Sequence, residues 1–144
     1  MILRTLPHLV APGAYSCNGC WMATMDEALQ FVKRNFESKE LTDTLLRLTF
    51  SIDAERSQVV FFEVNNDFAV FSSPFAEAED VTPKQALTAA GEYLAGIQLV
   101  GDFYYVKHMA PLANLDESEI EDGFDLVANI ADRLEEELVG SDVV

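Results

Sequence analysis

Two short stretches hold the residue types that most often do chemistry in proteins. Cys17 and Cys20 stand in the motif CNGC, and His108 follows Lys107 at the end of VGDFYYVKH. A structural zinc ion needs four ligands, and a redox-active CxxC pair belongs at a helix start that follows a strand. The chain has no second CxxC, and its only other histidine is His8. We therefore expect no metal and no cofactor, with Cys17 and Cys20 as the alternative metal or redox site.

Catalytic motifs are not recognisable in the chain. A nucleophile needs a base beside it, and the sequence contains no G-x-S-x-G, P-loop or G-x-G-x-x-G pattern. Acidic pairs such as Glu119 and Glu121 indicate a solvated helix face, because carboxylates that act as acids or bases need burial. We expect a protein that is not an enzyme. The alternative is a small-ligand-binding protein or enzyme with a pocket near Tyr105 and His108.

Charge and composition limit the classes of partner that the chain can bind. The 144 residues, 49% of them hydrophobic, suffice for one domain with its own core. Nine basic and 25 acidic residues give a net charge of −16, which repels phosphate backbones and anionic lipids. Residues 112–144 hold eleven of the acids and one arginine. We expect no nucleic acid and no membrane partner, and a cytoplasmic location, because two cysteines make no disulfide scaffold.

The domain organisation follows from where regular patterns begin. Residues 1–22 show no periodicity, and His8 and Pro12 interrupt the apolar run that a signal peptide would need. We expect an N-terminal extension over 1–22, one domain over 23–140 and a tail over 141–144.

Three helix starts are marked by capping chemistry. Thr24, Thr82 and Asp116 are each followed three residues later by Glu or Gln, and Pro83 stands at a first helical position. Apolar residues then recur at helical spacing over residues 25–36 and 120–138, with a small-residue helix over about 83–95. Between and after these segments, alternation with period two predicts strands in LLRLTFSI, QVVFFEV, DFAVFSS, IQLV and FYYVKHM.

The predicted order is α-β-β-β-α-β-β-α, which favours a two-layer α+β domain with an antiparallel sheet. Its strands have a second apolar set, out of phase with the first: Leu45, Val59, Phe61, Ala69 and Phe71. Helices on one side of a sheet need only one apolar face. A symmetric partner, a client polypeptide or the N-terminal extension would cover the other. As partner-binding residues we expect Val59, Phe61, Phe71, Tyr104 and Tyr105.

The stretch GDFYYVKHMAPLANLDESEIEDGFDLVANIADRLEEEL, the helix MDEALQFVKRNFE and the strands between them resemble YbjN-like domains and class I type III secretion chaperones of the CesT/SycE kind. The similarity covers about residues 24–139. It implies a homodimer without cofactor that binds protein segments through apolar surface, in a chaperone-like or regulatory role. The acidic last helix would steer basic partners.

Overall fold

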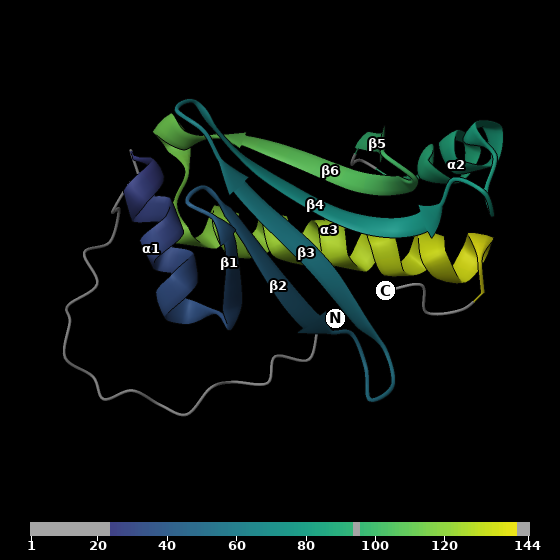
Figure 1. The fold of residues 1–144 in the computed structure, drawn as a ribbon, viewed down its shortest axis with the longest axis horizontal. Helices are drawn as coiled ribbons and strands as arrows, with labels where there is room; N and C mark the ends of the chain where they lie inside the picture. Colours follow the sequence, from purple (N-terminus) through teal and green to yellow (C-terminus); the bar gives the residue numbers. More distant parts are fainter. Residues whose placement is uncertain (1–23, 94–95, 141–144) are drawn as a thin grey trace.

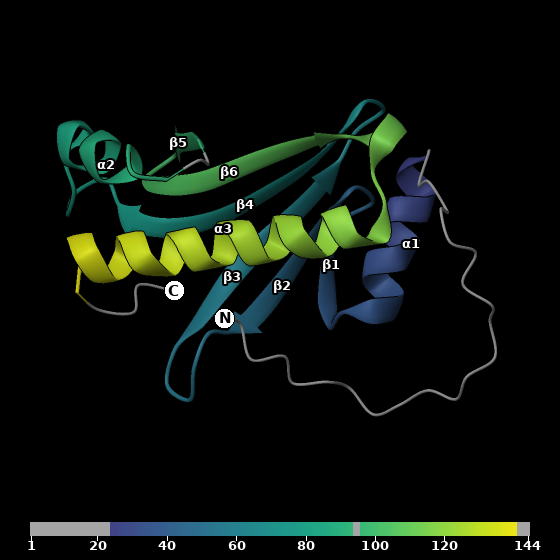
Figure 2. The same cartoon turned by 180° about the vertical axis from the view of Figure 1, so that it is seen from behind.

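The computed structural model describes residues 24–93 and 96–140. The elements in chain order are α1 (Met25–Asn35), β1 (Ser38–Thr42), β2 (Leu45–Ser51), β3 (Ser57–Val64), β4 (Phe68–Glu77), α2 (Pro83–Ala90), β5 (Gly96–Val100), β6 (Phe103–Pro111), the 3-10 turn η1 (Leu112–Asn114) and α3 (Glu117–Leu138) (Figures 1 and 2). The predicted α+β class is confirmed. The alternative site at Cys17 and Cys20, the expected extension over 1–22 and the expected tail over 141–144 lie outside the described residues.

All six strands form one antiparallel sheet in the order β1-β2-β3-β4-β6-β5. The prediction missed β1, whose sequence SKELT is polar and almost wholly exposed. An edge strand needs no apolar face, so alternation could not reveal it. Between β5 and β6, Gly101 has φ +58°, while no non-glycine residue of 24–93 and 96–140 has a positive φ. This agrees with a II′ turn, which needs a positive φ only at its first central position.

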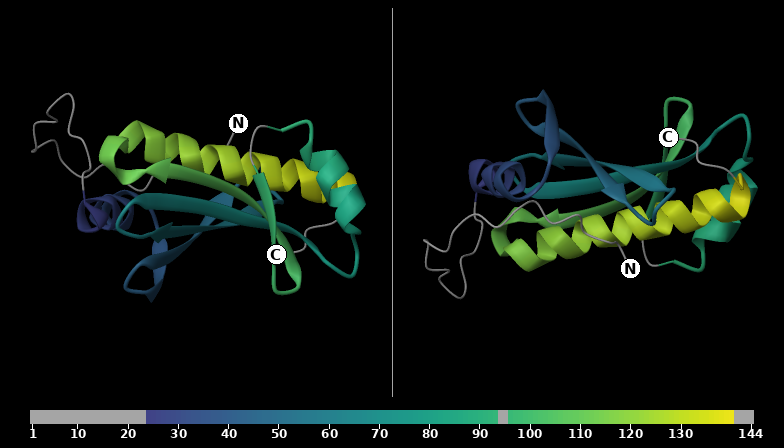
Figure 3. Two further views of the ribbon diagram at one scale, coloured as in Figure 1. Left: turned by 90° about the horizontal axis from the view of Figure 1, so that it is seen from above. Right: turned by 90° about the horizontal axis from the view of Figure 1, so that it is seen from below.

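The helices and the sheet form two layers. The long α3 lies along one face of the sheet, which we call the inner face, and packs on β3, β4 and β6 (Figure 3). Phe36, just after α1, contacts Phe124 of α3, and α2 packs beside α3. The opposite face, which we call the outer face, has no helix on it among the described residues.

The inner face is filled by an aromatic cluster with Phe124 at its centre. The Phe124 ring lies 5.1–5.5 Å, centroid to centroid, from four other phenylalanine rings: Phe36, Phe50, Phe62 and Phe71. The preceding residue, Gly123, lets the helix approach closely, since a Cβ there would lie 2.8 Å from the Phe71 ring. The Phe124 ring therefore fills the space between helix and sheet, and the missing side chain at Gly123 lets the helix backbone come close to Phe71.

All three helix N-caps lie where the capping pattern predicts. Thr82 and Asp116 form complete capping boxes with Gln85 and Glu119. At α1 the reciprocal bond differs, because the Thr24 hydroxyl itself donates to the Glu27 carboxylate. The small-residue helix α2 is shorter than expected and ends at Ala90, where Gly91 caps it.

The Asp116 cap should make stability depend on acid pH. Hydrogen bonds from the Glu119 backbone N–H and the Ser118 hydroxyl lower the pKa of Asp116 below its ordinary value of 3.8. Because the folded pKa is depressed, this stabilisation is present above the unfolded pKa and is lost as pH falls through the folded one. Asp116→Asn keeps a capping oxygen without the charge. We expect its deficit in urea unfolding to be largest at neutral pH and to shrink at acid pH; a deficit constant with pH would contradict this.

Candidate protein-binding surface

The outer face of the sheet is a surface that the described helices leave open. Its side chains come from alternate positions of each strand, as the pairing registers define. The apolar members are Leu45, Val59, Phe61, Phe68, Val70, Phe103, Tyr105 and Met109. Met109 is 50% exposed and Phe68 37%. This face therefore has apolar and aromatic side chains at its centre and along one end.

Two of the five expected partner-binding residues meet on this face. The rings of Phe61 on β3 and Tyr105 on β6 lie 6.3 Å apart in an edge-to-face contact, although one strand separates β3 from β6. Both side chains are partly exposed. Val59 also lies on the outer face but is buried, so it supports its neighbours and offers little area to a partner.

The expectation that Phe71 and Tyr104 are available to a partner is wrong. Phe71 pairs with Phe62 in the register of β3 and β4 and is fully buried under Phe124. Tyr104 is 5% exposed and stacks on Phe75. Ala69, assigned with Phe71 to the second apolar set, is also in the core. Both faces of β4 are apolar, so period two could not decide which one faces α3, and the turn before β4 set the register instead.

The alternative of one pocket shared by Tyr105 and His108 is not supported by the register of β6. Three positions apart on one strand, these side chains lie on opposite faces of the sheet. Tyr105 meets Phe61 on the outer face, whereas the His108 ring lies 5.8 Å from Phe71 on the inner face. The alternation of side chains along β6 is sufficient to predict that Tyr105 and His108 lie on opposite faces.

Three cations lie on the outer face in one line. Lys39, Arg47, Phe61, Ser72 and Lys107 are successive partners across β1, β2, β3, β4 and β6. We call this line the basic row. The basic row could not be predicted from the sequence, because residues on different strands become neighbours only through the pairing registers.

The two edges of the sheet differ. The edge strand β1 carries Lys39 and Glu40, charges of the kind that discourage edge-to-edge pairing. The other edge, β5, has the sequence GIQLV without charge or proline. On it Leu99 is 49% and Val100 53% exposed, and α2, which packs on β5, exposes 63% of Leu87. The β5 edge is therefore open to pairing with another strand.

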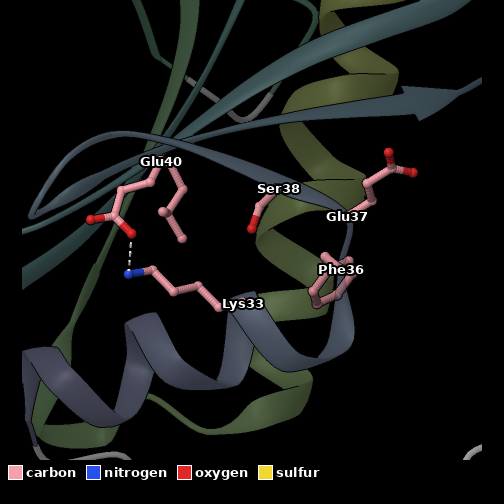
Figure 4. Close-up of a pocket in the computed structure, with 6 residues that line it drawn as sticks. Lys33, Phe36, Glu37, Ser38 and Glu40 are labelled. Carbon is pink, nitrogen blue, oxygen red and sulfur yellow. Dashed lines mark hydrogen bonds and ion pairs between the residues drawn. The ribbon is translucent and has the colours of Figure 1, made fainter.

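A pocket of about 320 Å³ lies between α1 and β1 (Figure 4). The Lys33 and Glu40 side chains point toward each other across its mouth, and Lys33 Nζ donates to Glu40 Oε2 at 2.6 Å. Both side chains are partly exposed. The pair ties α1 to β1, and its cation already has a carboxylate partner, so we assign no ligand to this pocket.

A buried polar cluster joins α3 to β3 and β4. Gln58 Nε2 donates to Glu135 Oε2 at 2.6 Å, and the Ser73 hydroxyl lies 3.1 Å from Gln58 Oε1 and 2.7 Å from the Val59 carbonyl. Within the described ranges no buried side-chain nitrogen or oxygen lacks a hydrogen bond. A fully bonded cluster of this kind positions elements and leaves no group for a substrate.

Arg56 closes the solvent side of this cluster. It contacts Asp53 at 3.0 Å, Asp132 at 3.3 Å and Glu136 at 3.2 Å. The hydrogen bond that Arg56 donates to Asp53, the neighbouring charge of Asp132 and the hydrogen bond that Arg56 donates to Glu136 raise the pKa of Arg56. The pKa of Asp53 is lowered by the Glu55 backbone N–H and by Arg56. These groups form a structural ion-pair network between the β2–β3 turn and α3.

Among residues 24–93 and 96–140, no three His, Cys, Asp or Glu side chains are grouped so as to hold a metal ion. In the same residues, no helix is both long and apolar enough to cross a membrane. No protein-family model and no curated protein matches the chain. The resemblance to YbjN-like domains and secretion chaperones therefore stays a prediction.

Proposed function

We propose that the chain is a protein-binding module, not an enzyme, that works as a homodimer and binds a further polypeptide. The observation that supports this best is the outer face, on which Phe61 and Tyr105 contact each other with no described helix above them. Burying apolar surface stabilises a complex by roughly 25 cal/mol per Å² before the costs of association. We also propose a chaperone-like or regulatory role, which the resemblance supports, and a cytoplasmic location, which the scarcity of cysteine supports.

The β5 edge is the surface that we propose for the dimer. Two antiparallel copies of an edge strand can pair about a two-fold axis, which gives a closed interface with the same residues on both sides. In a chain of net charge −16 this edge is an uncharged segment that can meet itself without repulsion. Leu87 beside it adds apolar area from α2.

Replacing Leu99 with lysine should raise the dimer dissociation constant by more than about tenfold, because it would bury two unpaired charges in the interface. Light scattering after size-exclusion chromatography measures this over a concentration series. The control is Leu41→Lys on the β1 side, which changes the net charge equally at a leucine of similar exposure, and it should leave the dimer intact. A parent protein that is monomeric at every concentration would refute the dimer.

A further inference from the structure

The outer face differs in charge from the rest of the chain. Its strand positions hold the three cations of the basic row and two acids, Glu63 and Glu77. The whole chain has 25 acids and nine bases. A third of all the lysines and arginines thus lie on the one face that no described helix covers.

These cations have not been neutralised by the fold. Lys33 and Arg56 each form ion pairs, whereas Lys39, Arg47 and Lys107 form none with any residue of 24–93 and 96–140. The Lys107 ammonium instead donates to Gln98 Oε1 at 2.8 Å, a contact that leaves its charge uncompensated. An anionic partner could therefore pair with them without breaking an existing ion pair.

The spacing of the row points to the form of that partner. Neighbouring strands lie about 4.8 Å apart, so Arg47 and Lys107, three steps apart in the sheet, are separated by roughly 14 Å at the backbone. An extended peptide advances about 3.4 Å per residue with alternate side chains on one face. Residues i and i+4 of such a peptide span the same length. Residue i+2 then lies about 7 Å from each end, between Phe61 and Ser72, where the Phe61 ring extends toward Tyr105.

We propose that the outer face binds an extended acidic peptide segment of the pattern acid-x-apolar-x-acid along the basic row. The two acids pair with Arg47 and Lys107, and the apolar residue packs on Phe61 and Tyr105. This inference rests on the proposed function, and it names the partner that the outer face selects.

Two other occupants fit the row less well. A second copy placed symmetrically on this face would bring cations of the row toward each other, which opposes binding. A nucleic acid carries charge along its whole length and is repelled by the net charge of −16. A peptide with two acids places negative charge only where the cations lie.

Three fluorescent nine-residue peptides test the proposal, with Glu, Gln or Lys at the two charged positions, leucine between them and threonine elsewhere. By anisotropy at about 0.15 M salt, where distant charges are screened, the Glu peptide should bind about three- to tenfold tighter than the Gln peptide, and the Lys peptide most weakly. The double variant Arg47→Glu, Lys107→Glu should reverse the order. The milder pair Arg47→Gln, Lys107→Gln should abolish it.

The matched control is the double variant Lys84→Glu, Arg133→Glu, which makes the same charge change at exposed positions of α2 and α3 and should keep the parent's order. Equal binding of all three peptides that is lost in Phe61→Ser would overturn the acidic preference and leave the proposed function standing. No binding of any peptide would overturn both the acidic preference and the proposed role of the outer face in binding a further polypeptide, while the dimer through the β5 edge has its own test. Tighter binding of a nine-nucleotide oligouridine than of the Glu peptide would replace the peptide with a nucleic acid.

Discussion

Phe124→Ala should lower the free energy of unfolding by about 3–5 kcal/mol. The Phe124 ring contacts four other phenylalanine rings and is 1% exposed. Its removal leaves a cavity that neighbours from α1, β2, β3 and β4 border together. Urea unfolding followed by circular dichroism gives the value.

Phe68→Ala is the control for this change. Phe68 is 37% exposed on the outer face and touches none of these rings, so its loss should cost only about 1–2 kcal/mol. If the two variants lose equal stability, the cluster around Phe124 does not hold the two layers together.

Gly123→Ala should destabilise the protein although alanine is the better helix former. The new methyl group would lie 2.8 Å from two atoms of the Phe71 ring, which is fully buried and cannot move aside. Overpacking costs about 1–3 kcal/mol, against a gain of about 1 kcal/mol in helix propensity. We expect a net loss of up to about 2 kcal/mol in chemical denaturation.

A double-mutant cycle isolates the clash. Phe71→Leu removes the ring that the methyl group meets, so the Gly123→Ala change should cost less in that background, with a coupling of about 1 kcal/mol or more. Gly96→Ala in β5 is the control, because a Cβ there meets only the Lys107 carbonyl oxygen at an ordinary 3.8 Å. Additive losses at Gly123 and Phe71 would show that the two do not clash.

The helices and most strands were predictable because their signals are local. Thr82 and Asp116 bind the backbone three residues on, and this chemistry is read directly from neighbouring residue types. The face of β4 was not predictable, because Val70 and Phe71 are equally apolar and only the pairing with β3 decides between them. β1 was missed because its residues are polar.

The candidate surface was predictable only in part. The second apolar set predicted an uncovered face of the sheet. Two of the expected partner-binding residues, Phe61 and Tyr105, do lie on that outer face. The basic row and the uncharged β5 edge depend on which strands are neighbours. In particular, β6 lies between β4 and β5 in the sheet, and no local sequence pattern predicts this strand order.

The position of α3 after all six described strands has a consequence during synthesis. Every strand leaves the ribosome before the helix that covers the inner face, so Phe62 and Phe71 meet water until Glu117–Leu138 has emerged. A nascent chain in that state exposes a broad hydrophobic surface and is prone to aggregate. The acidic residues of α3 emerge together with the apolar residues that cover the inner face. They add like-charge repulsion between neighbouring chains while the inner face is being buried.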